Sequence, residues 1–286
     1  MPSEAMSAFN DEMRRTRRAL LNSDYDPVAM RGILATLDAV GPGPNSRMLG
    51  LSTLELRHDE GAALLIYVPG GGFCFPGGDS HRALLDRICE ATNSRGALLQ
   101  YRLAPEHPYP AAHSDVLHAL RVLLAEEAGP VFVMCDSAAG ALVLCACAQL
   151  SRERQRLPDK LVCLSVLTDL AMTGRSNISN AEADPMFGPQ AVMHKVFHYL
   201  QGANPAQAAV SPFWDDAIKL PETLFIVGSS EVMRDDTLRY AEKADRAGTK
   251  TKVSVYEDAP HVLALLEGIP EADQAVNEIS AFLRTD

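Results

Sequence analysis

The sequence has 286 residues, which is enough for one large α/β domain or two smaller ones and enough to bury a sizeable core. Apolar residues make up 47% and charged residues 22%, as in ordinary globular proteins. Acidic residues outnumber basic ones by 37 to 26, and the net charge of −11 argues against nucleic acid or an anionic membrane surface as a partner.

Membrane insertion and export are also disfavoured. No run approaches the roughly 18 apolar residues that a membrane helix needs, and the charged N-terminus lacks the apolar core of a signal peptide. The six cysteines contain no C-x-x-C pair, so neither a zinc ribbon nor a thioredoxin-like site is indicated. We therefore expect a soluble protein of the reducing cytoplasm, with no membrane partner, no cofactor and no metal.

The first 45 residues predict two helices, over about 9–21 and 28–40, that stand apart from the main fold. Asp26-Pro27 is a plausible start for the second helix, and a Gly-Pro break follows at 41–44. We assign 1–45 to the N-terminal part of a helical cap.

Strands and helices alternate from residue 46 onward. We expect strands over about 49–57, 62–68, 97–101, 131–136, 161–167, 224–228 and 252–256, and helices over about 79–88, 111–125, 236–246 and 271–282, with another directly after the strand at 131–136. Most of these strands are nearly all apolar, which predicts an α/β fold with a largely parallel sheet covered on both faces.

One segment, 171–212, interrupts this alternation and contains a predicted helix at 189–200. We expect it to be a cap insertion that packs with 1–45 as a lid. The catalytic core then consists of 46–170 and 213–286.

The residues that follow the strands predict a reaction, because ligands of open parallel sheets bind at the carboxyl ends of the strands. A glycine run follows one strand, a serine stands at a sharp strand-to-helix turn, acidic residues follow a later strand and a histidine follows the last. They are Gly70, Gly71, Gly72, Ser137, Glu231, Asp235, Asp236 and His261. Together they are the parts of an acyl-transfer site, and the order Ser, acid, His is that of the α/β-hydrolases.

Longer motifs carry a family resemblance across nearly the whole chain. They are Pro69-Gly70-Gly71-Gly72-Phe73, the stretch from Tyr101 to Ala112, Asp136-Ser137-Ala138-Ala139-Gly140, Ser211-Pro212, 220–223, Arg234-Asp235-Asp236 and Ala259-Pro260-His261. With these motifs the chain resembles the hormone-sensitive-lipase-like (bacterial family IV) carboxylesterases of the α/β-hydrolase superfamily. The resemblance implies a mostly parallel central sheet, helices on both faces and a helical cap.

The resemblance also implies roles for individual residues. Ser137 would attack the ester carbonyl and His261 would act as its base, oriented by an acid. That acid would be Glu231, with Asp235 and then Asp236 as alternatives. Backbone N–H groups of Gly71, Gly72 and Ala138 would bind the oxyanion. Four apolar residues are candidates for the substrate pocket, although such residues are more often core: Phe73, Phe75, Met193 and Phe197.

The chain departs from the family pattern in three places. Pro69 replaces a histidine that braces the oxyanion loop, Cys135 and Ala139 replace the two glycines around the nucleophile, and Glu231 replaces an aspartate. Asp136, beside the nucleophile, is expected to support the loop. His194 and His198 have an i,i+4 spacing, but no third ligand supports a metal site.

The leading hypothesis is a serine hydrolase that cleaves carboxylic esters of small or medium acyl chain through an acyl-enzyme intermediate. Its partner would be a small-molecule ester, and a homodimer is a candidate assembly because relatives are often dimers. Two alternatives remain: an amide, carbamate or lactone hydrolase with the same machinery, and a non-catalytic small-molecule receptor on the same fold.

Overall fold

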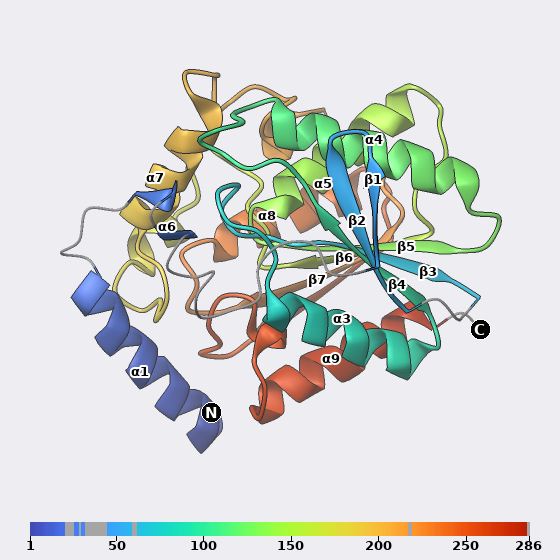
Figure 1. The fold of residues 1–286 in the computed structure, drawn as a ribbon. Helices are drawn as coiled ribbons and strands as arrows, with labels where there is room; N and C mark the ends of the chain where they lie inside the picture. The colour runs from blue at the N-terminus through green and yellow to red at the C-terminus, as the bar shows by residue number, and fades with distance from the viewer. Residues whose placement is uncertain (21–25, 29, 32–44, 59–61, 217–218, 285–286) are drawn as a thin grey trace.

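The computed structural model describes residues 1–286 apart from 21–25, 29, 32–44, 59–61, 217–218 and 285–286 (Figure 1). Most of the predicted helix at 28–40 and the break at 41–44 lie outside the described residues. At the start of that helix, the Asp26 carboxylate accepts a hydrogen bond from the N–H of Val28 at 2.9 Å.

Eight strands form one sheet in the described part of the chain, in the order β1-β2-β4-β3-β5-β6-β7-β8. They are β1 (Ser46–Leu49), β2 (Ser52–His58), β3 (Leu64–Val68), β4 (Arg95–Gln100), β5 (Val131–Asp136), β6 (Lys160–Leu164), β7 (Glu222–Gly228) and β8 (Thr251–Tyr256). Two of the pairings are antiparallel, β1 with β2 and β2 with β4, and the others are parallel. The predicted α/β fold with a mostly parallel sheet is therefore confirmed.

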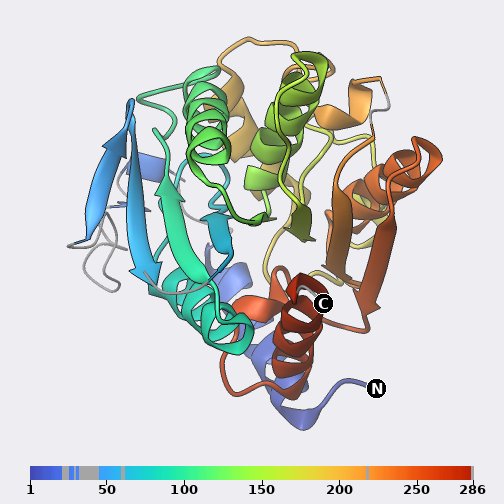
Figure 2. The same ribbon diagram turned by 90° about the vertical axis from the view of Figure 1, so that its right-hand side faces the viewer.

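Helices cover both faces of this sheet. The described helices are α1 (Glu4–Leu20), α3 (Asp79–Thr92), α4 (Ala111–Glu126), α5 (Ala139–Arg152), α6 (Ser176–Ser179), α7 (Pro189–Leu200), α8 (Arg234–Arg246) and α9 (Pro270–Leu283), with short 3-10 turns at Pro212–Trp214 and Leu263–Leu265. Figures 1 and 2 show α4, α5 and α8 on one face and α3 and α9 on the other. Each helical layer packs against the sheet through a separate hydrophobic cluster.

The central strand β3 explains why the sheet needs both layers. Its five residues, Leu-Leu-Ile-Tyr-Val, are all buried, and it pairs in parallel with β4 on one side and β5 on the other. Leu64 and Ile66 pack into one cluster while Leu65 and Tyr67 pack into the other. Such a strand is stable only between two helical layers.

Two local details differ from the predictions. The strand predicted over 49–57 is found from Ser52 onward as β2, but it forms a hairpin with β1, and Gly50 adopts a φ of 61° in the tight turn between them. Helix α3 is capped by Gly78 rather than by Asp79-Ser80, and the Gly78 N–H donates to Nδ1 of His81 at 3.2 Å. This bond orients the His81 ring at the start of the helix.

The two segments predicted to form a lid contact each other. The Arg17 guanidinium on α1 donates to the backbone oxygens of Asp184 at 2.5 Å and Ala181 at 2.6 Å. Figure 1 shows α1, α6 and α7 beyond the carboxyl ends of the strands. At its other end α1 is held to the core, because Ser3 donates to the Glu271 carboxylate on α9.

Candidate active site

The turn between β5 and α5, residues 137–138, holds Ser137 in a left-handed backbone conformation with a φ of 52°. Its N–H donates to the Leu164 carbonyl on β6 at 2.9 Å. This strand-to-helix elbow has the geometry that exposes a nucleophile. The close passage of helix and neighbouring loop falls at Gly140, where a Cβ would come closer than 3.0 Å to Val166. Alanine at 139 is thus accommodated, because the tight spot lies one residue later.

Ser137 is the first member of a hydrogen-bonded chain of three side chains. Its Oγ lies 2.8 Å from Nε2 of His261, and Nδ1 of His261 lies 2.7 Å from Oε2 of Glu231. His261 is 6% exposed and Glu231 is completely buried. The three residues come from the ends of β5, β8 and β7, as the order of the chain predicted.

The Glu231 carboxylate is held by further donors. Its Oε1 accepts hydrogen bonds from the Ser165 hydroxyl and from the Gly228 N–H, both at 2.6 Å. Burial raises the pKa of Glu231, although the hydrogen bonds from His261, Ser165 and Gly228 oppose that shift by favouring the charged form. Ser165 also accepts from the Val262 N–H at 3.0 Å, so it ties the acid to the histidine loop.

The two alternative acids contact other groups. The Asp235 carboxylate accepts from the N–H of Ser176 at 3.1 Å, and the Asp236 carboxylate accepts from the N–H groups of Thr168 and Asp169 at 2.9 Å. Of the three acidic candidates, Glu231 is the one bonded to His261.

The glycine loop, residues 69–73, is braced without the histidine of the family pattern. The Tyr101 hydroxyl donates to the carbonyl of Pro69 at 2.9 Å, and the Gly70 N–H donates to Oδ1 of Asp136 at 2.9 Å. Tyr67 donates to the same carboxylate oxygen at 2.8 Å. Asp136 therefore supports the loop, as expected.

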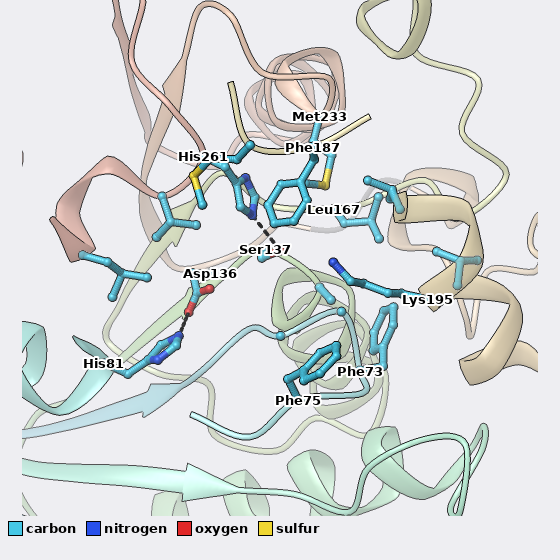
Figure 3. A pocket seen from close by; sticks show the side chains of 18 of the residues that line it. Phe73, Phe75, His81, Asp136, Ser137, Leu167, Phe187, Lys195, Met233 and His261 are labelled. Atoms are coloured by element: carbon cyan, nitrogen blue, oxygen red, sulfur yellow. Dashed lines mark hydrogen bonds and ion pairs between the residues drawn. The ribbon is translucent and has the colours of Figure 1, made fainter. Parts of the chain in front are cut away.

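The Asp136 carboxylate is ionised more readily than an ordinary aspartate, even though it is buried. Burial opposes the charge, but the contacts with His81, Tyr67 and Gly70 outweigh burial and lower its pKa. His81 Nε2 lies 3.7 Å from Asp136 Oδ1 (Figure 3). The loop is thus anchored on a buried negative charge.

A cavity of about 360 Å³ opens above Ser137, between the glycine loop and helix α7. The three predicted oxyanion residues, Gly71, Gly72 and Ala138, line it, as do Phe73 and Phe75. A volume of this size lies at the lower end of small-molecule sites.

Met193 and Phe197, also predicted to line the pocket, are a correction. They are 57% and 69% exposed and do not line the cavity. Helix α7 turns its other side inward, and Val192, Lys195 and Val196 line the cavity at i, i+3 and i+4 spacing.

Sequence reasoning missed Lys195 and Phe187. The Phe187 ring packs edge-on against the His261 ring at 5.1 Å between centroids, and Nζ of Lys195 lies 4.3 Å from the Phe187 centroid. The available signal was the spacing of Lys195 with the apolar residues Val192 and Val196. A preference for apolar side chains in a pocket wall selects the opposite face of the helix.

Among the described residues, no group of three or more His, Cys, Asp and Glu side chains is arranged to hold a metal ion. His194 and His198 pack their rings against each other with centroids 4.6 Å apart. Nor is any described helix both long enough and apolar enough to cross a bilayer.

A family model described as alpha/beta hydrolase fold matches residues 65–265, which include all three members of the Ser137–His261–Glu231 chain. The chain belongs to the α/β-hydrolase fold family. Within it, an esterase of Acinetobacter venetianus is 30% identical over 281 residues, covering 94% of this chain and 93% of its own. An acetyl-hydrolase of Streptomyces hygroscopicus is 32% identical over 77% of this chain and 75% of its own.

Solved structures of similar proteins agree with this assignment. The crystal structure of an esterase from the bacterial hormone-sensitive lipase family superposes on this α/β-hydrolase with a TM-score of 0.87, at 32% identity over 99% of both chains. A structure of EstE5 gives a TM-score of 0.88 at 27% identity, covering 99% of this chain and 98% of its own. The predicted resemblance is confirmed: the chain is a hormone-sensitive-lipase-like carboxylesterase of the α/β-hydrolase superfamily.

Proposed function

We propose that this α/β-hydrolase cleaves carboxylic esters of small or medium acyl chain through an acyl-enzyme intermediate on Ser137. The observation that carries the proposal is the unbroken chain from Ser137 Oγ through His261 to Glu231, with contacts of 2.8 and 2.7 Å. A hydroxyl, a base and a buried acid in this order form an activated nucleophile. Named esterases among the relatives support the choice of an ester bond.

In the first half of the reaction, Ser137 Oγ attacks the ester carbonyl carbon while Nε2 of His261 takes the hydroxyl proton. The carbonyl oxygen becomes an oxyanion, and the N–H groups of Gly71, Gly72 and Ala138 are the proposed donors to it. When the C–O bond to the alcohol breaks, His261 passes its proton to the leaving oxygen. The acyl group then remains on Ser137.

The second half repeats these steps with water. His261 takes a proton from a water molecule, whose oxygen attacks the acyl carbon, and returns the proton to Ser137 as the carboxylic acid leaves. Glu231 keeps Nδ1 of His261 protonated and stabilises the imidazolium that forms in each half. Both halves therefore use one constellation.

The size of the cavity supports a small or medium acyl chain. A volume of about 360 Å³ must hold both the acyl and the alcohol part when the lid has the observed position.

An amide, carbamate or lactone would be cleaved by the same catalytic groups, so a comparison of matched esters and amides distinguishes those activities. The intact Ser137–His261 contact favours an enzyme over a receptor. A cytoplasmic location and a homodimer stay predictions. Light scattering, which measures the molar mass in solution, would test the homodimer.

The proposal is tested with a series of 4-nitrophenyl esters from acetate to decanoate. We expect a burst of 4-nitrophenol, highest kcat/KM for the shorter chains, and a loss of about 10⁶-fold in turnover for Ser137→Ala. A serine-directed fluorophosphonate should add to the wild type and not to Ser137→Ala. The exposed serine of α1 supplies a matched control, Ser7→Ala. Unchanged turnover in Ser137→Ala would refute the proposal.

A further inference from the structure

The cap helix α7 places a lysine in the wall of the catalytic cavity. Lys195 lines the cavity between Val192 and Val196, which lie on the same face of the helix. Figure 3 shows its side chain pointing into the cavity toward Ser137. Among the described residues that line the cavity, Lys195 is the only lysine or arginine.

Two contacts with described residues of the cavity wall help to position the Lys195 side chain. Its stem lies across the glycine loop, because a Cβ on Gly72 would come closer than 3.0 Å to Cδ of Lys195. Its Nζ lies 4.3 Å from the centroid of the Phe187 ring, which itself packs on His261. The ammonium group is thus held over the space next to the reacting atoms, where part of a bound substrate must lie.

A positive charge at this position is costly. Burial lowers the pKa of Lys195 to about 8, against a weaker opposing effect of Cys74. At neutral pH the amine is still mostly protonated, in a wall built largely from apolar side chains. The wall beside Ser137 therefore offers a positive charge to a bound substrate.

The negative charge that also borders the cavity has other partners. Asp136 accepts hydrogen bonds from Tyr67 and Gly70, and His81 lies beside it. In Figure 3 Asp136 and Lys195 lie on opposite sides of Ser137. A substrate can therefore place its ester at Ser137 and an anionic group at Lys195, away from the Asp136 carboxylate.

We propose, on the basis of the proposed esterase function, that Lys195 selects esters that carry a free carboxylate, such as half-esters of dicarboxylic acids. The ammonium donates a charge-assisted hydrogen bond to the free carboxylate while the ester carbonyl lies at Ser137. Lys195 is in this view a specificity-determining residue in the substrate pocket. The apolar residues of the cavity alone would admit any ester of suitable size, whereas Lys195 restricts the preferred substrates to esters with a free carboxylate.

The test compares two esters that differ in charge and hardly in shape: monomethyl adipate and the methyl ester of adipic monoamide. We expect the ratio of their kcat/KM values, acid over amide, to fall roughly 10- to 100-fold in Lys195→Met, because a hydrogen bond to a charged group is lost. Lys195→Arg should keep most of the ratio. An exposed lysine far from the cavity gives the control, Lys250→Met, whose ratio should equal that of the wild type. Thermal melting checks the fold of each variant.

A binding measurement separates this inference from the proposed function. Calorimetry with Ser137→Ala, alone and combined with Lys195→Met, measures the affinity for both esters without turnover. If the acid ester binds more tightly and Lys195→Met removes that preference, the anion site stands even where no ester is hydrolysed. If Lys195→Met leaves both the kinetic ratio and the relative affinity unchanged, the inference is overturned while esterase activity is unaffected.

Discussion

Nδ1 of His261 lies 2.7 Å from Oε2 of Glu231, and the other oxygen of this carboxylate is bonded to Ser165 and to the Gly228 N–H. One buried carboxylate therefore links the histidine to the end of β7 and to the residue that follows β6. The departure from aspartate at position 231 has a structural meaning here. With glutamate at this position, each carboxylate oxygen has its own set of donors.

Replacing Glu231 tests this arrangement. Glu231→Gln keeps the shape but removes the charge that stabilises the His261 imidazolium, so we expect kcat/KM for 4-nitrophenyl acetate to fall by about 10³- to 10⁴-fold. Glu231→Asp keeps the charge but shortens the reach, and we expect a smaller loss, on the order of 10- to 100-fold. Asp235→Asn serves as the matched control, because Asp235 bonds to Ser176 instead of His261. An equal loss in Asp235→Asn would contradict the assignment of the acid.

Ser165 gives a second prediction, on the pH dependence. Its hydroxyl donates to Glu231 and thereby holds the pKa of that carboxyl below the value that burial alone would set. In Ser165→Ala this opposing hydrogen bond is lost, so the pKa of Glu231 rises further and the carboxylate takes up a proton at higher pH. We expect the acid limb of the kcat/KM profile to move to higher pH, with a loss of roughly fivefold or more on the plateau. A lower plateau with an unshifted limb would leave Ser165 a purely structural role.

The support of the glycine loop can be tested through Asp136. Asp136→Asn keeps the side-chain shape but removes the charge that receives the Gly70 and Tyr67 donors. Because oxyanion donors act in the transition state, we expect kcat to fall about 10- to 100-fold with little change in KM. Tyr67→Phe removes one donor only and should give a smaller fall in the same direction. If steady-state kinetics show a raised KM at constant kcat in both variants, the loop does not act through the oxyanion.

Ser137 and His261 could be predicted because their positions follow from the order of strands, turns and helices in the sequence. An apolar strand followed by a sharp turn placed Ser137, and the order of strand ends placed the acid and His261 on the same edge of the sheet. The choice of Glu231 over Asp235 also needed a family resemblance, since both follow the same strand. The role of Ser165 could not be predicted from the sequence. Its hydroxyl, just after β6, contacts Glu231, which lies 66 positions later in the chain.

Helix α7 is a different case, because its bounds could be predicted from the sequence but the face that it turns toward the cavity could not. The bounds of α7 were predicted as 189–200 and found there, because the helical run begins at Pro189 and ends before a glycine turn. Which side of the helix faces the cavity depends on how the cap docks on the core, and periodicity does not encode that. Met193 and Phe197 were therefore chosen over Lys195. The hairpin at 50–51 was missed because its turn contains one glycine, Gly50, and an apolar residue, Leu51, inside an alternating run.

Asp236 leads to a prediction about stability. This carboxylate on α8 is 1% exposed, and burial raises its pKa to about 7, assisted by the nearby Asp169 and opposed by the Thr168 and Asp169 N–H groups. In the unfolded chain its pKa is near 3.8. Between these two values the folded protein holds a proton that the unfolded chain has lost. The free energy of unfolding therefore falls as the pH rises from about 4 to about 7.

Asp236→Asn removes this titration and keeps an oxygen that can accept from the two N–H groups. Relative to wild type, we expect the variant to gain up to about 3 kcal/mol in free energy of unfolding between pH 5 and pH 8. Urea unfolding of both proteins at the two pH values measures the difference. An exposed aspartate of the same helix provides the control, because Asp245→Asn should leave the pH dependence as in wild type. If the free energy of unfolding changes equally with pH in Asp236→Asn and in wild type, the Asp236 carboxyl is already ionised at pH 5 in the folded protein.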